Sequence, residues 1–344
     1  MIGARLSELM STESFKNSLN VAVIGKSGHA ARHIEVLRQK RDVKLHSVYY
    51  PKKVNQSDLP LTTNFDDLLE TDAVIISSPT PTHVEYMELL ENYEGYILVE
   101  KPAVSTEEQA LKLKSWPDER KSRVKINYNL RHSEIANTLS RVLSFSEMGA
   151  PIFFDVHTSH GLAFKDSYKH SWRDDLAKSF GVMELVGTHY INLAISLFGP
   201  VSESQTDCCW VARPEKKVAP DTVFTRLKMR LGVIVNLFHS YAAPFYNRMM
   251  LNCTNGYWEY NGHEAKLHYP RDSFDSKGRF TAPPLVERKV LDFATIWRES
   301  LSFSLDDFLD TVRERGSFSS ADFDIALDTM GPIFRARSSF TKES

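Results

Sequence analysis

The sequence predicts an α/β protein with a doubly wound parallel sheet in its N-terminal half and a large, open, mostly antiparallel sheet in its C-terminal half. Three observations predict this class. Before about residue 150, short apolar runs alternate with helical patterns, as in parallel strands joined by right-handed crossovers. After that point, strand patterns follow one another with short turns. The length of 344 residues exceeds one typical core and favours two domains.

The N-terminal half opens on an apolar run at residues 21–24 that ends at Gly25, a pattern typical of a strand buried on both faces. Further strands are expected at residues 43–50, 73–77, 96–99 and 124–128. Helical patterns predict helices at residues 30–38, 66–70, 83–92 and 106–113. We therefore expect an N-terminal arm at residues 1–19 and a first domain at residues 20–130.

A second domain is expected at residues 131–344. Asn255-Gly256 and Asn261-Gly262 are signals of hairpin turns between antiparallel strands. The other expected elements are strands at 152–160 and within 222–269, a helix at 182–197 and closing helices near 305–313 and 321–336. The closing helices are assigned to this domain.

Composition excludes several classes of partner. The formal net charge of −2 gives no electrostatic reason to bind nucleic acid or an anionic membrane. No apolar run is long enough to cross a bilayer, and the N-terminus lacks the apolar segment of a signal peptide. Cys208, Cys209 and Cys253 are odd in number and include a neighbouring pair, so they form no disulfide framework. A cytoplasmic location is therefore expected.

The first strand leads into Gly25-Lys26-Ser27-Gly28-His29-Ala30, which approximates the dinucleotide fingerprint G-x-G-x-x-G/A of Rossmann domains. Gly25 would allow the tight turn, and Ala30 is small enough for close helix–strand packing. Free N–H groups at the helix N-terminus would bind a pyrophosphate. We expect cofactor contacts from Gly25, Ser27, Gly28, His29 and Ala30. The alternative is an ordinary glycine turn.

The end of the second strand bears on the choice of cofactor. NAD-binding domains usually carry an acid there that holds the ribose hydroxyls. This chain has Tyr50, Lys52 and Lys53 instead, and lysines suit the 2′-phosphate of NADP. These three residues are expected to contact the cofactor, which we expect to be NADP, with NAD as the alternative.

At Glu100-Lys101-Pro102 the chain resembles the glucose–fructose oxidoreductase / inositol dehydrogenase (Gfo/Idh/MocA) family. Further segments resemble motifs of that family in the same order: Ser77 to His83, Tyr128 to Arg131, Trp172-Arg173 and Gly187-Thr188-His189. The resemblance covers nearly the whole chain from Val21 onward. It implies a Rossmann domain followed by an α/β domain with a large open sheet. It also implies oxidation or reduction of a sugar, sugar nucleotide, cyclitol or related carbonyl compound.

The resemblance also implies site residues. Beyond the phosphate turn, the expected cofactor contacts are Ser78, Pro79, Thr80, His83, Glu100, Lys101 and Asn129. The expected substrate contacts are Lys101, Trp172, Arg173, His189 and Tyr190. Glu100 is expected to orient other groups rather than to react.

Lys101 and His189 are the expected catalytic residues. Hydride transfer from an alcohol needs a group that takes the hydroxyl proton and a donor or cation near the oxygen. Lys101 follows the carboxyl end of a predicted parallel strand, where ligands of such sheets bind. The imidazole of His189 suits proton exchange near neutral pH. Both are expected to approach the same substrate hydroxyl.

The chain departs from the family pattern near His189. The family commonly carries an acid one helical turn before this histidine and often another three residues after it, where this chain has Leu185 and Asn192. Glu184 is the nearest acid, but α-helical spacing would place it off the His189 face. Help from Tyr190, His157 or His160 is one explanation, and loss of turnover with retained ligand binding is another.

Two alternatives to a sugar oxidoreductase therefore stay open: a cofactor-binding relative with weak or no catalysis, and a reductase of a non-sugar carbonyl or imine. No metal is expected, because His157 and His160 would point to opposite faces of a strand. Pairing of open sheets predicts a homodimer or homotetramer formed through the C-terminal sheet.

Overall fold

The computed structural model describes residues 18–52, 57–169, 171–214 and 218–343. The expected arm at residues 1–19 therefore falls almost wholly outside the described residues. The chain divides into two compact units. The N-terminal unit comprises the chain up to Val104, Glu108–Asn127 and Ser304–Asp324. The C-terminal unit comprises Ser105–Glu107, Tyr128–Phe303 and the chain from Ile325 onward.

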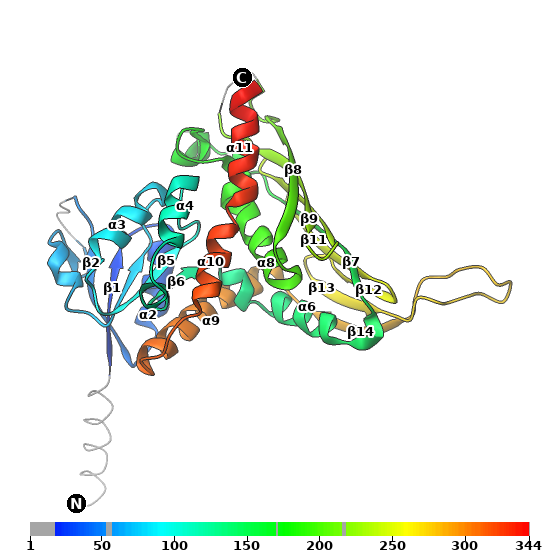
Figure 1. Ribbon diagram of the computed structural model, residues 1–344, viewed down its shortest axis with the longest axis horizontal. Helices are drawn as coiled ribbons and strands as arrows, with labels where there is room; N and C mark the ends of the chain where they lie inside the picture. The colour runs from blue at the N-terminus through cyan, green and yellow to red at the C-terminus, as the bar shows by residue number, and fades with distance from the viewer. Residues whose placement is uncertain (1–17, 53–56, 170, 215–217, 344) are drawn as a thin grey trace, which may run out of the picture. The chain divides into compact units, whose positions relative to one another are not determined.

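The described part of the N-terminal unit contains a six-stranded parallel sheet (Figure 1). Its strands are β1 (Leu19–Ile24), β2 (Val43–Tyr49), β3 (Leu61–Thr62), β4 (Ala73–Ile76), β5 (Tyr96–Glu100) and β6 (Val124–Asn127), in the order β3-β2-β1-β4-β5-β6. The connecting helices are α2 (His29–Arg38), α3 (His83–Leu89), α4 (Glu107–Lys114) and α5 (Asp118–Lys121). The strand order reverses between β1 and β4, the place where such sheets bind ligands. The expected parallel sheet is confirmed.

The core of this unit explains why the second half of one closing helix belongs to it. α9 (Phe293–Arg313) is much longer than the helix expected near 305–313. Its Leu305, Phe308 and Leu309 are fully buried in the same cluster as Ile34 of α2 and Val23 of β1. The assignment of every closing helix to the second domain is therefore corrected, because residues 304–324 belong to the N-terminal unit.

An eight-stranded sheet forms the described part of the C-terminal unit. Its strands are β7 (Pro151–Ser159), β8 (Val201–Cys209), β9 (Thr222–Met229), β10 (Ile234–Ser240), β11 (Tyr246–Cys253), β12 (Gly256–Tyr260), β13 (Glu264–His268) and β14 (Leu285–Val290). The order is β14-β13-β12-β11-β7-β10-β9-β8, and β7 pairs in parallel with β10 while the other neighbours are antiparallel. The expected open, mostly antiparallel sheet is confirmed, including both hairpin turns.

Helices cover one face of this sheet. The helices of the unit are α6 (Glu134–Ser144), α7 (Asp166–Lys169), α8 (Thr188–Phe198) and α11 (Gly331–Glu343), with α10 (Ser320–Asp328) and α9 shared between the two units. α6 and α8 lie on the same face (Figure 1), where Phe198 of α8 meets Phe154 of β7. β9 alternates buried and exposed residues, as expected for a sheet packed on one side only. No described helix is both long and apolar enough to span a membrane.

Removal of a large α9 side chain should test the role of this helix in the N-terminal unit. Phe308 is fully buried, so Phe308→Ala should lower the free energy of unfolding of this unit by about 3–5 kcal/mol. Phe303 of the same helix is 51% exposed, and Phe303→Ala is the matched control with an expected loss under about 1 kcal/mol. Urea denaturation measures both. Equal losses in the two variants would contradict this account of α9.

Candidate functional site

The turn after β1 requires glycine at its first position. The Gly25 N–H donates to the Tyr49 carbonyl at 3.1 Å, and the Ser77 N–H donates to the Ile24 carbonyl at 3.0 Å. Gly25 has a φ of 110°, and a Cβ there would lie 2.8 Å from the Ser77 carbonyl oxygen and 3.3 Å from the Ala30 Cβ. A side chain at Gly25 would therefore push the turn away from β4 and from the buried Ala30.

The space around the start of α2 fits a pyrophosphate. Gly28 has a φ of 63°, and a Cβ there would meet nothing within 4 Å. No side chain caps the N-terminus of α2, so its first N–H groups can bind an anion. Ser27 and Gly28 lie in the turn before these groups. The turn therefore has the properties that a dinucleotide phosphate needs.

The end of β2 carries positive charge. The Lys26 ammonium lies 4.5 Å from the centre of the Tyr50 ring, which holds a cation at this strand end. Lys52 is exposed, and Lys53 lies outside the described residues. Lys26 was not singled out in the sequence, because a lysine in a glycine turn is usually a solvated side chain.

The loop after β4 is braced from inside the protein. Thr82 Oγ1 donates to Ser78 Oγ at 2.8 Å, within the turn that includes Pro79 and Thr80. His83 is buried, and its two ring nitrogens lie 2.8 Å from the Ser78 carbonyl oxygen and 2.9 Å from the Pro102 carbonyl oxygen. Both ring nitrogens thus have backbone partners, and the cofactor contact expected of His83 stays a prediction. His83 connects the loop after β4 to the loop after β5.

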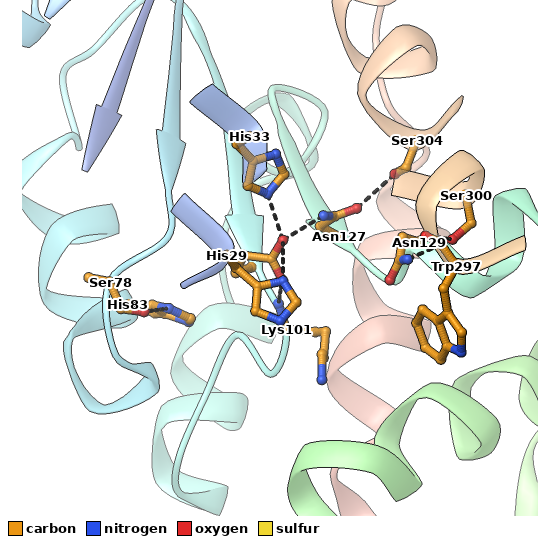
Figure 2. A network of polar contacts seen from close by, with 11 residues as sticks. His29, His33, Ser78, His83, Lys101, Asn127, Asn129, Trp297, Ser300 and Ser304 are labelled. Carbon is orange, nitrogen blue, oxygen red and sulfur yellow. Dashed lines mark hydrogen bonds and ion pairs between the residues drawn. The ribbon is translucent and has the colours of Figure 1, made fainter. Parts of the chain in front are cut away.

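A buried hydrogen-bond network surrounds the carboxylate of Glu100 at the end of β5 (Figure 2). Its Oε1 atom lies 2.7 Å from His33 Nε2 and accepts a bond from Asn127 Nδ2 at 2.7 Å. Its Oε2 atom accepts from the backbone N–H of Lys101 at 3.2 Å. Ser304 Oγ on α9 donates to Asn127 Oδ1 at 2.7 Å. The network fixes the chain at the point where Lys101 follows β5, as the expected orienting role of Glu100 requires.

Glu100 and His29 have different charge states at neutral pH. Burial alone would raise the pKa of Glu100, but His29, His33 and the Asn127 hydrogen bond outweigh it and hold that pKa below its usual range. Glu100 raises the pKa of His29, whereas burial and the charges of Lys101, Arg32 and His33 together lower it to about 4. At pH 7, Glu100 is therefore an anion and His29 is neutral.

Asn129 lies just after β6, and its amide has a structural partner. Its Nδ2 atom donates to Ser300 Oγ on α9 at 2.8 Å. Ser300 is one helical turn before Ser304, so α9 binds two asparagines of one segment in succession. A contact between Asn129 and a dinucleotide would use the carbonyl oxygen of its side chain or the second N–H of its amide.

In the C-terminal unit, His189 lies near the start of α8 and is buried between two aromatic rings. The ring centre of Trp297 is 4.8 Å away and that of Tyr128 is 6.4 Å away, both nearly perpendicular to the imidazole. Trp297 comes from α9, and nothing in its sequence context indicated this contact. The two rings fix the plane of the His189 imidazole.

The segment before His189 is not the expected α-helix. Met183–Gly187 forms a π-helix, with hydrogen bonds five residues apart, and α8 begins at Thr188. α-helical spacing, which would place Glu184 off the His189 face, therefore does not apply to this segment. Glu184 is buried, and its Oε2 accepts from the Phe180 N–H at 2.8 Å. A Cβ on Gly187 would lie 3.3 Å from the His239 ring, so this motif position must stay small.

Tyr190 points into the interior. It is fully buried, and its ring stacks on His239 at a centroid distance of 5.1 Å. The substrate contact expected of Tyr190 stays a prediction, and in this structure its side chain is enclosed. Burial raises its pKa, which further disfavours Tyr190 as a proton acceptor.

Trp172 borders a hollow in the C-terminal unit, and Arg173 lies next to it in the sequence. The Arg173 guanidinium lies 4.8 Å from the centre of the Trp172 ring. The hollow has a volume of about 580 Å³ and is lined in part by Trp172, Asp174 and Lys178. It is large enough for a small polar ligand. Among the described residues, no group of three histidine, cysteine or acidic side chains is placed to hold a metal ion.

Comparison with known families agrees with this architecture. Residues 19–128 match the GFO/IDH/MocA family described as "Oxidoreductase family, NAD-binding Rossmann fold". Residues 137–259 match the GFO/IDH/MocA C-terminal domain. Together, the two matches cover most of the chain, in the order that the two sheets predict.

Individual relatives are more distant. The chain is 26% identical to glucose-6-phosphate 3-dehydrogenase of Bacillus subtilis over 187 aligned residues. The aligned region covers 52% of this chain and 53% of that protein. The chain thus spans about half the length of that curated relative. A myo-inositol dehydrogenase from Corynebacterium glutamicum has a similar fold, with a TM-score of 0.70 and 17% identity over 91% of this chain and 95% of that one. Levoglucosan dehydrogenase in complex with NADH has a TM-score of 0.74 and 16% sequence identity, over 93% of this chain and 98% of that one.

A bulky residue at Gly25 should abolish dinucleotide binding. Gly25→Val places a branched side chain against the Ser77 carbonyl, at a φ that only glycine adopts easily. Titration of NADH and NADPH by fluorescence should show binding to the wild type and none to the variant. Gly278→Val is the control, because Gly278 also has a positive φ but lies in the C-terminal unit with open space around it. Unchanged affinity in a folded Gly25→Val protein would refute the phosphate-turn assignment.

Proposed function

Because the chain belongs to the GFO/IDH/MocA oxidoreductase family, we propose that it is an NAD(P)-dependent dehydrogenase or reductase acting on a hydroxyl or carbonyl of a sugar, sugar nucleotide or cyclitol. One observation carries this proposal. The glycine turn that fits a pyrophosphate and the braced strand end that presents Lys101 lie at the same edge of one parallel sheet. Ligands of doubly wound sheets bind at this edge.

The residues divide the chemistry between them. When bound, the nicotinamide accepts or supplies the hydride. Gly25, Ser27, Gly28 and the N-terminus of α2 would hold the pyrophosphate. Lys101 stabilises negative charge on the substrate oxygen, and His189 exchanges the proton of that oxygen.

The substrate class is supported by the relatives and by the hollow beside Trp172. The relatives described above act on glucose 6-phosphate, myo-inositol and levoglucosan according to their names, and all three compounds carry several hydroxyl groups. Ser171 and Lys178 give the hollow polar partners for such groups. A non-sugar carbonyl or imine would favour a more apolar lining, which makes it the weaker alternative.

Loss of catalysis is the second candidate function. Leu185 and Asn192 occupy positions where the family commonly has acids, and Asn192 is buried with its amide donating to Thr329 Oγ1 at 2.9 Å. A chain of this kind would bind a dinucleotide without turning it over. Incubation of NADP and NAD with a panel of sugars, sugar phosphates and cyclitols, followed at the absorbance of the reduced nicotinamide, decides between the two functions.

We further propose a cytoplasmic homodimer or homotetramer formed through the open face of the C-terminal sheet. The exposed Phe224 and Tyr246 lie on this face, where the His157 ring contacts Phe238 and Tyr246. Apolar rings on an uncovered sheet face favour association with a second copy.

NADP preference should depend on the two described lysines near the end of β2. Lys26→Gln combined with Lys52→Gln should weaken NADPH binding by about 10- to 100-fold, a total loss of about 1.4–2.8 kcal/mol from two charged contacts that water partly screens. NADH binding should change by less than about threefold, because NADH lacks the 2′-phosphate. Lys44→Gln, an exposed lysine within β2, is the control. Equal losses for both nucleotides would overturn the NADP assignment.

Removal of either assigned catalytic side chain should slow turnover without loss of the cofactor. Lys101→Ala and His189→Ala should each lower kcat by at least about 100-fold, while the Kd for the nucleotide stays within about threefold. Leu185→Asp tests the second candidate function. Activity that appears only in Leu185→Asp would identify the wild type as a binding protein, and an active His189→Ala would remove His189 from the mechanism.

A further inference from the structure

His29 differs from the other described histidines that contact the strand ends of the N-terminal sheet. The side chain of His29 is 45% exposed, whereas His33 and His83 are buried. His29 is the first residue of α2, beside the phosphate turn. It is thus an imidazole that both solvent and a ligand can reach.

His29 is held next to a fixed anion. Its Nδ1 atom lies 4.0 Å from Glu100 Oε1, a distance that a small ring movement would shorten to a hydrogen bond. Glu100 itself cannot turn away, because His33, Asn127 and the Lys101 N–H all hold its two oxygens. A proton on Nδ1 would therefore face the carboxylate and leave Nε2 as the basic atom.

The same imidazole lies beside Lys101. Figure 2 draws the two side chains next to each other, and the Lys101 charge is one of the influences on His29. From this geometry we propose that His29, oriented by Glu100, is a second proton-exchanging residue that acts on the substrate oxygen alongside Lys101. The proposal rests on the proposed function, since it needs a hydroxyl substrate and a nicotinamide.

The protonation states agree with this role. The groups that face His29 are Glu100 from β5, Lys101 after it, and Arg32 and His33 from α2. Their combined effect with burial lowers the pKa of His29 to about 4, so the imidazole is neutral at pH 7. Glu100 stabilises the imidazolium once it forms, as a carboxylate does for the base that it orients.

The step balances. In the oxidation, the bound nicotinamide would take the C–H hydrogen with its electron pair, and the O–H proton would pass to Nε2 of His29, in the role that the proposed function gives to His189. The C–O bond becomes a C=O bond. His29 then releases the proton to water through its exposed side. The reduction follows the same path in reverse.

The first test does not depend on turnover. Diethyl pyrocarbonate modifies neutral, accessible imidazoles, so mass spectrometry should find His29 modified at pH 6 and protected by bound NADPH or NADH. His263, an exposed histidine of the C-terminal unit, is the control and should react equally with and without nucleotide. Absence of modification at His29, or modification without protection, would overturn the proposal.

The second test separates proton exchange from a structural role. His29→Ala should lower kcat/KM by roughly 100-fold or more, and added imidazole should restore part of the rate. Glu100→Gln should shift the acidic limb of the pH profile to lower pH, because loss of the negative charge disfavours the imidazolium. His263→Gln should match the wild type in rate and pH profile.

Failures of the two proposals are distinguishable. Wild type that binds the nucleotide but turns over no substrate contradicts the proposed function, whereas the modification of His29 is still measured. Wild type that turns over while His29→Ala keeps its rate and pH profile contradicts the role of His29 alone. A slow His29→Ala protein that imidazole does not rescue also contradicts it.

Discussion

The hydrogen bonds around the buried carboxylate of Glu100 are the constraint that holds the strand end and the Lys101 backbone in place. It is buried and ionised, and an unpaired buried charge would cost several kcal/mol. Its partners come from different elements, with His33 on α2, Asn127 on β6 and Ser304 on α9 bonding through Asn127. Removal of one partner would leave a buried polar group unsatisfied, at a cost of about 1–3 kcal/mol. The position of Lys101 is thus set by packing and bonding around its neighbour.

The sequence predicts the parts of the N-terminal unit that have a local pattern and misses those that depend on long-range contacts. The alternation of apolar runs and helical patterns predicts the parallel sheet, because burial on both faces leaves a local signature in β1 and β4. The bond between Asn127 and Ser304 joins residues 177 positions apart, and no local pattern encodes it. The same holds for Phe308, whose burial against β1 and α2 decides that α9 contributes to the N-terminal unit.

A motif match in the sequence indicates where a residue lies along the chain, but not which side chains surround it in the fold. His83 stands in a segment that resembles a cofactor loop, yet its ring is buried between two carbonyl groups. Tyr190 follows a motif histidine, yet it stacks on His239 inside the sheet. The π-helix at Met183–Gly187 changes which residues share a face, and helical periodicity in the sequence does not distinguish it from an α-helix. In each case, the missing information is a tertiary contact or a local change of helical pitch.

His29 and His33 show how one carboxylate can serve two purposes. They are four residues apart on α2, so both side chains lie on the same helical face toward Glu100. His33 bonds Glu100 at 2.7 Å and is fully buried, and within the described part of the chain its Nδ1 has no hydrogen-bond partner, so it has no route to exchange a proton with water. His29 is 4.0 Å away and partly exposed, so it can exchange one. The buried histidine fixes the charge that the accessible histidine needs, and a ligand beside Lys101 can reach only the second.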